Sequence, residues 1–176
     1  MHPIASVGVL MGILIGLVIA FALLRFSNTN RRMKTEYDER QQAIRGKGYM
    51  LAFYTILTYE VLMIVLSIGE IRLPIEDYVL HFCGVVLGCI ALGTYCVWQG
   101  VYWGLNNNRR RYIVVFAVCG ILNAIPVLGL LRGSGITENG KIGFPAINIL
   151  VLIMMAILAV ELIIKEVLDR REKEED

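Results

Sequence analysis

Few side chains of this 176-residue chain could do chemistry, and the most unusual of them is an acid inside an apolar run. Glu60 lies in the mostly apolar stretch from Gly48 to Gly69, near mid-membrane if that stretch crosses a bilayer. A carboxyl group at such a depth costs at least ~2.5 kcal/mol and usually faces other helices, a cavity or a partner. Glu60 is therefore predicted either to couple to a proton or cation, or to hydrogen-bond a neighbouring helix as a protonated carboxyl.

Three further polar side chains fall inside apolar runs. His81 stands one turn inside the outer end of its run, where a histidine can respond to external pH but is more often simply solvated. Asn123 lies beside Pro126, and Asn148 follows Pro145. Because a proline frees backbone groups that neighbours must satisfy, both amides are candidates for hydrogen bonds between helices.

The remaining reactive side chains do not form the clusters that enzymes and metal sites need. The four cysteines lack the Cys-x-x-Cys spacing and histidine partners of a metal site, and their apolar surroundings favour packing. The chain has two histidines, and its intramembrane acids are scattered in depth, whereas a membrane enzyme gathers such groups at one depth. We therefore predict no enzyme activity, no catalytic residue, no metal and no cofactor.

Membrane-spanning helices are expected to position these side chains. The chain is 57% hydrophobic and 18% charged, against about 45–50% and about 25% in soluble domains. Unpaired backbone groups are costly in lipid, so a helix of roughly 20 residues is the expected way across ~30 Å of hydrocarbon. The sequence predicts an all-α membrane protein, a single five-helix bundle over residues 1–176, with helices at about 3–25, 48–69, 78–105, 112–131 and 142–165.

The lysines and arginines orient this bundle. If the N-terminus is outside, seven basic residues lie between Leu24 and Gly48, three between the third and fourth helices and four from Lys165 onward, whereas only three lie on the outer side. Such a bias marks the cytosolic side of a membrane. The C-terminus is therefore predicted to be cytosolic, with a cytosolic loop over 26–47 and a cytosolic tail over 166–176.

Glycines at four-residue spacing predict where helices touch. Small residues at this spacing let another helix backbone approach closely inside lipid. Two interpretations remain open: self-association through a glycine zipper on the first helix, and packing within one bundle. The protein is expected to be a homo-oligomer or a subunit of a membrane complex. The glycines with this spacing on the first and third helices are Gly8, Gly12, Gly16, Gly84, Gly88, Gly100 and Gly104.

The cytosolic loop ends in a compact charged segment that begins at Tyr37. It is predicted to be a short amphipathic element resting on the inner membrane surface, with Gly46 and Gly48 allowing a bend before the second crossing. From Arg25 to Lys47, seven basic and three acidic residues give a local charge of +4, which favours anionic lipids. The candidates for interaction at the cytosolic face are Tyr37, Asp38, Glu39, Arg40, Arg45, Arg109, Arg110 and Arg111.

The same segment carries a resemblance to known proteins. The stretch YDERQ from Tyr37, the stretch IRGKG from Ile44 and the aromatic residues after them are similar to a region in small, uncharacterised integral membrane proteins of Firmicutes. The similarity covers residues 34–60. It implies a multi-pass protein of the bacterial cytoplasmic (inner) membrane with an accessory or regulatory role, and it assigns no catalytic residue.

Two functions from different classes follow. The first is an accessory or regulatory membrane protein that binds protein or lipid at the cytosolic face, because charge is concentrated there and little of the chain lies outside the membrane. The alternative is a small transport or channel component in which Glu60 is the ion-coupling or proton-coupling group. Neither function involves nucleic acid.

Overall fold

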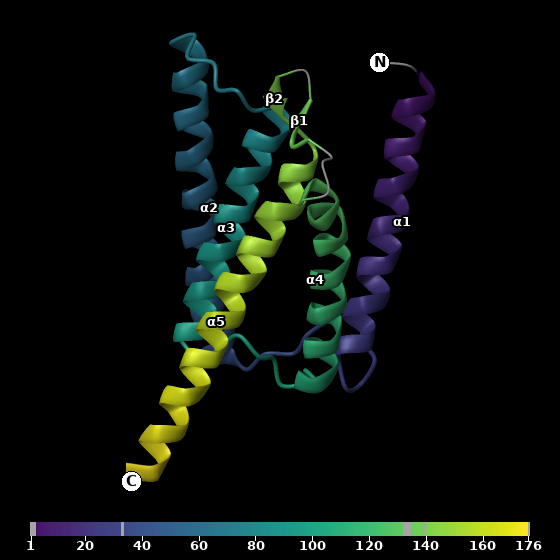
Figure 1. Ribbon diagram of the computed structural model, residues 1–176. Coiled ribbons are helices and arrows are strands. Elements are labelled where there is room, and N and C mark those ends of the chain that lie inside the picture. The colour runs from purple at the N-terminus through teal and green to yellow at the C-terminus, as the bar shows by residue number, and fades with distance from the viewer. Residues whose placement is uncertain (1–2, 33, 132–134, 139, 176) are drawn as a thin grey trace. The chain divides into compact units, whose positions relative to one another are not determined.

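The computed structural model describes the backbone of residues 3–32, 34–131, 135–138 and 140–175, and the side chains of these residues apart from 3–13, 131, 138, 172, 173 and 175. Within them the fold is all-α, with five helices and one short antiparallel pair of strands (Figure 1). The elements are α1 (Pro3–Ser27), α2 (Glu39–Ile68), α3 (Asp77–Trp98), α4 (Arg109–Leu131), β1 (Thr137–Glu138), β2 (Lys141–Ile142) and α5 (Pro145–Glu175).

Four of the described helices, α2, α3, α4 and α5, are long and apolar enough to cross a membrane. The part of α1 whose side chains are described, Leu14–Ser27, is apolar but shorter. Large apolar side chains such as Val18, Val65 and Ile121 are more than half exposed. Lipid covers such a surface in a membrane protein, whereas in water it would be an aggregation hazard. The fold is therefore that of a membrane protein.

The chain divides into two compact units. The first comprises residues 1–38 and 103–117, and so contains α1, the loop that follows it and the first turns of α4. The second comprises residues 39–102 and 118–176, and contains α2, α3, the strands, α5 and the rest of α4.

In the second unit α3 packs against both α2 and α5, and glycines make the close approach possible (Figure 1). A Cβ added to Gly84 would lie 2.7 Å from the Tyr59 ring, and one added to Gly88 would lie 2.5 Å from Ile56, so both glycines face α2. A Cβ on Gly93 would clash with a leucine of α5. The glycine pair predicted on the third helix therefore packs inside the chain, as the second of the two interpretations expects.

The glycines of α1 stand differently. Gly8 and Gly12 lie outside the residues whose side-chain surroundings are described. A Cβ on Gly16 would meet nothing within 4 Å among the described residues. Self-association through this face stays a prediction.

The third helix ends earlier than predicted, at Trp98 instead of Leu105. Gly100 has a φ of +68°, and the N–H of the residue after it donates to the Cys96 carbonyl at 2.9 Å. This closes the helix in a Schellman motif, in which glycine takes the left-handed position at no steric cost. Gly100 and Gly104 therefore do not extend the glycine face of the helix; Gly100 stops it, and Gly104 lies in the loop that follows.

The second helix begins earlier than predicted, at Glu39 instead of Gly48. The amphipathic element expected before it is thus its first part, and Gly46 and Gly48 are helical rather than bent. Gly48 is buried, and a Cβ there would lie 3.1 Å from the side chains of Leu92 and Tyr95. The glycine is needed for the close approach of α3, not for a bend.

The fifth helix continues without a break through the predicted cytosolic tail. Glu166 and Arg170 pair at 2.7 Å, as their spacing predicts. Lys165 pairs with Asp169 at 2.6 Å. Such i,i+4 pairs stabilise an exposed helix by a few tenths of a kcal/mol each, roughly 0.2–0.5 kcal/mol.

Candidate functional site

Helices α2 and α3 bring together two polar residues that the sequence treated separately. His81 Nδ1 lies 2.8 Å from Glu60 Oε2. The side chain of Glu60 is 32% exposed and that of His81 62% exposed, so the pair lies at the edge of the helix contact rather than enclosed within it. A carboxyl and an imidazole at this distance form a hydrogen bond or an ion pair, and the position of the proton decides which of the two it is.

Gly84 provides the space for this pair. A Cβ at Gly84 would lie 3.0 Å from Glu60 Oε1 and 2.7 Å from the Tyr59 ring. The Tyr59 hydroxyl donates to the Leu80 carbonyl at 2.8 Å. Two consecutive residues of α2 thus bond to two consecutive residues of α3, and a predicted packing glycine and two predicted polar residues form a single site.

The pair lies near one end of both helices. Because α2 spans Glu39–Ile68, Glu60 is about 32 Å of helical rise from its start and only about 12 Å from its end. His81 is about 6 Å of rise from Asp77, the first residue of α3. The expectation of a mid-membrane depth assumed a helix that began nine residues later, from Gly48 rather than Glu39.

The two predicted amides do not join this pair. The Asn123 amide donates at 2.8 Å to the Cys119 carbonyl, one turn back in its own helix. Asn148 is half-buried on α5. Glu161 instead links two helices, since its Oε1 accepts a hydrogen bond from the Thr94 hydroxyl at 3.0 Å.

In the first unit, asparagines join the loop after α1 to the loop before α4, a feature that the sequence analysis missed. Asn28 is 1% exposed and Asn106 is 8% exposed. The Asn107 amide donates to Asn28 Oδ1 at 2.7 Å, and the Thr29 N–H donates to the Asn106 carbonyl at 2.7 Å. The name asparagine clasp is used below for Asn28, Asn30, Asn106 and Asn107.

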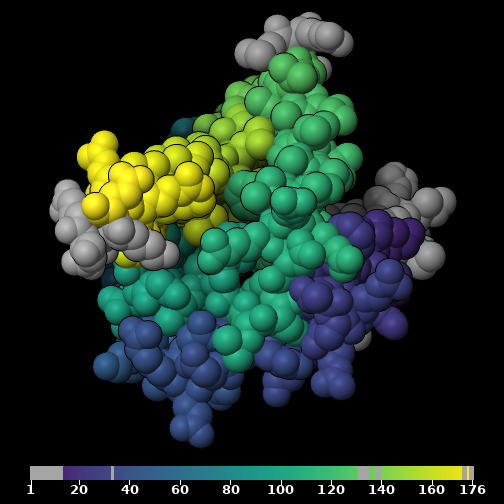
Figure 2. Space-filling view, turned by 90° about the horizontal axis from the view of Figure 1, so that it is seen from below, coloured from purple at the N-terminus to yellow at the C-terminus, as the bar shows by residue number. Residues whose placement is uncertain are grey.

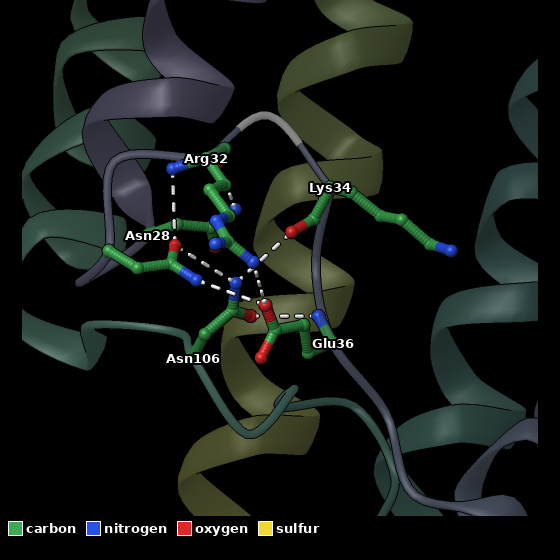
Figure 3. Close-up of polar contacts among 6 residues, drawn as sticks. Asn28, Arg32, Lys34, Glu36 and Asn106 are labelled. Carbon is green, nitrogen blue, oxygen red and sulfur yellow. Dashed lines mark hydrogen bonds and ion pairs between the residues drawn. The ribbon is translucent and has the colours of Figure 1, made fainter.

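Asn106 is the centre of the clasp, and its side chain points into the turn of the facing loop (Figure 3). Its Oδ1 accepts the Glu36 N–H at 2.8 Å, and its amide donates to Asn30 Oδ1 at 3.2 Å and to the Lys34 carbonyl at 3.1 Å. The asparagine side chain is short and carries both hydrogen-bond donors and an acceptor, so it can bond to an N–H and a C=O group of the facing loop at the same time. The available signal was the pair of asparagine-rich segments, Asn28-Thr-Asn30 and Asn106-Asn-Asn108, in two loops predicted on one side.

Two of the predicted interaction residues make bonds inside the chain. Arg45 donates to the Val101 carbonyl at 3.3 Å and to the Tyr49 hydroxyl at 3.1 Å. Arg111 donates to the Phe26 carbonyl at 3.4 Å and lies over the Phe26 ring. Both guanidinium groups therefore hold local structure together. Asp38, Glu39 and Arg40 are exposed, and Tyr37 is half-buried.

The clasp gathers exposed basic residues from two distant parts of the sequence. Figure 2 looks onto this end of the molecule, where the purple-to-blue residues after α1 lie beside the teal residues that lead into α4. Arg32 is 3.6 Å from Glu36, and Arg109 lies over the Trp103 ring. The basic platform is defined here as the exposed residues Arg31, Arg32, Lys34, Arg109 and Arg110.

No family model, curated protein or solved structure matches the chain. Among the residues that the structure describes, no three His, Cys, Asp or Glu side chains are grouped so as to hold a metal ion. The proposals on function therefore rest on three features of the structure: the Glu60–His81 pair, the asparagine clasp and the basic platform.

Proposed function

We propose that the protein is an accessory or regulatory membrane protein that holds an anionic partner at its cytosolic face through the basic platform. The observation that supports this most directly is the clasp, because its buried amides hold the basic loop after α1 to the loop that leads into the basic first turn of α4, both in the first unit. Charges that are already in place bind without the entropic cost of ordering two flexible loops. The partner is the anionic headgroup layer or an acidic protein segment in the same membrane complex, and each Lys or Arg contributes about 1 kcal/mol near an anionic surface.

The proposal includes five crossings of a bacterial cytoplasmic membrane, with the N-terminus outside and the C-terminus in the cytosol. The length and apolarity of α2 to α5, the apolar α1 and the one-sided distribution of basic residues support it. The platform then faces the cytosol, and the strands and the Glu60–His81 pair lie toward the outside. The resemblance of residues 34–60 to membrane proteins of Firmicutes favours the same location.

The threading is tested by cysteine labelling. With the four native cysteines replaced by serine, a Thr137→Cys variant is expected to react with an impermeant maleimide added to intact cells. A Lys34→Cys variant is expected to react only after the membrane is opened, because that loop faces the cytosol. Both should react in detergent, which controls for access. The opposite pattern in intact cells would rule out this topology.

The platform is tested by removing charge. The triple variant K34Q/R109Q/R110Q loses about 3 kcal/mol of attraction at about 1 kcal/mol per charge. Phosphatidylglycerol retained on the extracted protein, or an acidic protein cross-linked to it, should therefore fall by at least an order of magnitude. Native mass spectrometry counts the lipids, and cross-linking in membranes captures a protein.

A matched control separates the platform from charge in general. The variant K165Q/R170Q/R171Q removes the same three charges from the exposed end of α5, outside the first unit. Retention should stay near the wild-type level in this control. Equal loss in both variants, or no loss in the platform variant, would refute the platform as the binding surface.

One observation favours a second candidate function. The contact of Glu60 with His81 places a carboxyl and an imidazole together at the junction of two long apolar helices. In this second candidate function, the protein is a small transport or channel component, and the Glu60–His81 pair is its proton-coupling or ion-coupling group.

A further inference from the structure

A cavity of about 510 Å³ opens at the end of α2 and α3 that carries His81. The last turns of α2, the loop to α3, the first turns of α3 and one residue of β2 line it. Its volume falls in the range of roughly 300–1,000 Å³ that is typical of small-molecule sites. All of its lining belongs to the second unit, so the cavity is separate from the basic platform.

Backbone hydrogen bonds fix the rim of this cavity. The Ile142 N–H donates to the Pro74 carbonyl at 2.8 Å, and the Glu76 N–H donates to the Ile142 carbonyl at 2.9 Å. The loop between α2 and α3 is thereby joined to β2, which brings Lys141 to the cavity. Glu70 closes α2 with a φ of +54°, a left-handed conformation that residues other than glycine adopt only at a cost.

The cavity is lined by equal numbers of acidic and basic side chains. Two acids, Glu70 and Asp77, and two bases, Arg72 and Lys141, line it together with His81. None of the two acids and two bases forms an ion pair with another residue in the described part of the chain. The rest of the lining is largely apolar and includes Met63, Ile64, Leu66, Ile71, Leu73 and Leu80.

We propose that this cavity binds a small zwitterionic molecule with an apolar part. Its anionic group would pair with Arg72 and Lys141, its ammonium group with Glu70 and Asp77, and its apolar part would lie on the wall that α2 supplies. All four charged residues are exposed, so water solvates them in the empty cavity, and a ligand that carries both signs can replace that water at all four. Two sources offer this chemistry: a free amino acid with an apolar side chain, and the headgroup of phosphatidylethanolamine.

His81 reports on the cavity, because it lines the cavity and bonds to Glu60. The chain has only two histidines. An NMR spectrum of protein labelled at histidine in a His2→Gln background therefore isolates the His81 imidazole. A ligand in the cavity should shift that signal.

The experiment uses the full chain in nanodiscs of phosphatidylglycerol, with two probes. Leucine is titrated from solution, and in a separate arm phosphatidylethanolamine is added to the nanodisc lipid. We expect one probe or both to shift the His81 signal saturably. A response to leucine alone identifies a free solute, and a response to phosphatidylethanolamine alone identifies a lipid headgroup. If neither probe shifts the His81 signal, the proposal is overturned.

Paired variants test which charges take part. R72Q/K141Q and E70Q/D77N should each raise the Kd of the responding probe about tenfold or more, because each removes the charge-assisted contacts at one end of the ligand. R171Q/E174Q, which changes one charge of each sign on the exposed end of α5, should leave the Kd unchanged. Unchanged binding in both pocket variants overturns the proposal.

Protection of a thiol gives a readout that does not depend on those variants folding. Ser67 lines the cavity, and in a Ser67→Cys chain the rate of maleimide modification at this position is followed by peptide mass spectrometry. A saturating amount of the responding probe should slow this modification about tenfold or more, as occupancy of 90% or above requires. An unchanged rate would show that the probe binds elsewhere and would overturn the proposal.

Discussion

Replacing Glu60 with glutamine is expected to preserve the fold, whereas replacing it with alanine should lower the free energy of unfolding by about 1–3 kcal/mol. Glutamine keeps the length and hydrogen-bonding capacity that reach His81 Nδ1 at 2.8 Å. Alanine removes the partner of the imidazole and leaves empty the space beside Gly84 that the carboxyl fills. Unfolding in a mild detergent, followed by circular dichroism, measures both variants.

Two comparisons sharpen this result. Glu174→Ala removes an exposed acid from α5 and should leave stability within about 0.5 kcal/mol of the wild type. Gly84→Ala should also destabilise, because the added Cβ would lie 2.7 Å from the Tyr59 ring and 3.0 Å from Glu60 Oε1, so both side chains would have to move. Full stability of both Glu60→Ala and Gly84→Ala would show that the contact does not stabilise the α2–α3 packing.

The same variant separates the two candidate functions. In proteoliposomes with an internal pH-sensitive dye, we expect wild type and Glu60→Gln to give the same proton flux, as an accessory function requires. A folded Glu60→Gln variant that lost a flux carried by the wild type would replace the accessory function with the transport alternative. Glutamine makes this test clean, because it keeps the hydrogen bond but cannot ionise.

Replacing Asn106 with alanine should open the clasp and lower the free energy of unfolding by about 2–3 kcal/mol, since a buried group left without its partner costs roughly 1–3 kcal/mol. The substitution removes the partner of the Glu36 N–H and of the Lys34 carbonyl, and one of the two donors to Asn30 Oδ1, which keeps the Arg32 N–H. Hydrogen exchange at the Glu36 amide should accelerate, because it donates to the side chain that is removed. Exchange at the Thr29 amide should accelerate less, because its acceptor is the backbone carbonyl of residue 106, which alanine keeps. Asn123→Ala, which loses one bond within its own helix, is the matched control.

The clasp variant also tests the accessory function without changing any charge. If the clasp holds the basic platform in place, Asn106→Ala should lower the retained phosphatidylglycerol toward the level of K34Q/R109Q/R110Q. Normal lipid retention in an Asn106→Ala variant with fast-exchanging amides would show that the platform works without the clasp.

Local signals located the helices but not all of their ends. The all-α class and the long apolar helices followed from composition and from charge-free runs, because lipid leaves the backbone few other choices. The boundaries depended on contacts that a local pattern does not contain. Gly48 looked like a bend until its packing against α3 was visible, and Gly100 looked like a packing position until its φ showed a helix stop.

For the candidate sites, residue types were predictable and partners were not. The sequence singled out Glu60, His81 and Gly84 because charge inside an apolar run and glycine spacing are visible in one dimension. That the three form one site depends on the register between α2 and α3, which no residue spacing reveals. The asparagine clasp escaped notice for the same reason, since Asn28 and Asn107 are 79 residues apart.

The sequence by itself therefore determined the class of the protein, the approximate places of its apolar helices and the residues able to do chemistry, because each is a property of one segment in contact with lipid or water. Only the tertiary structure decided which of those residues meet. Glu60 bonds to His81, Arg45 and Arg111 anchor neighbouring carbonyls, and four charges surround one cavity, because contacts between segments depend on helix register and loop closure. Helix register and loop closure both depend on segments that are far apart in the chain, so neither can be read from a single stretch of sequence.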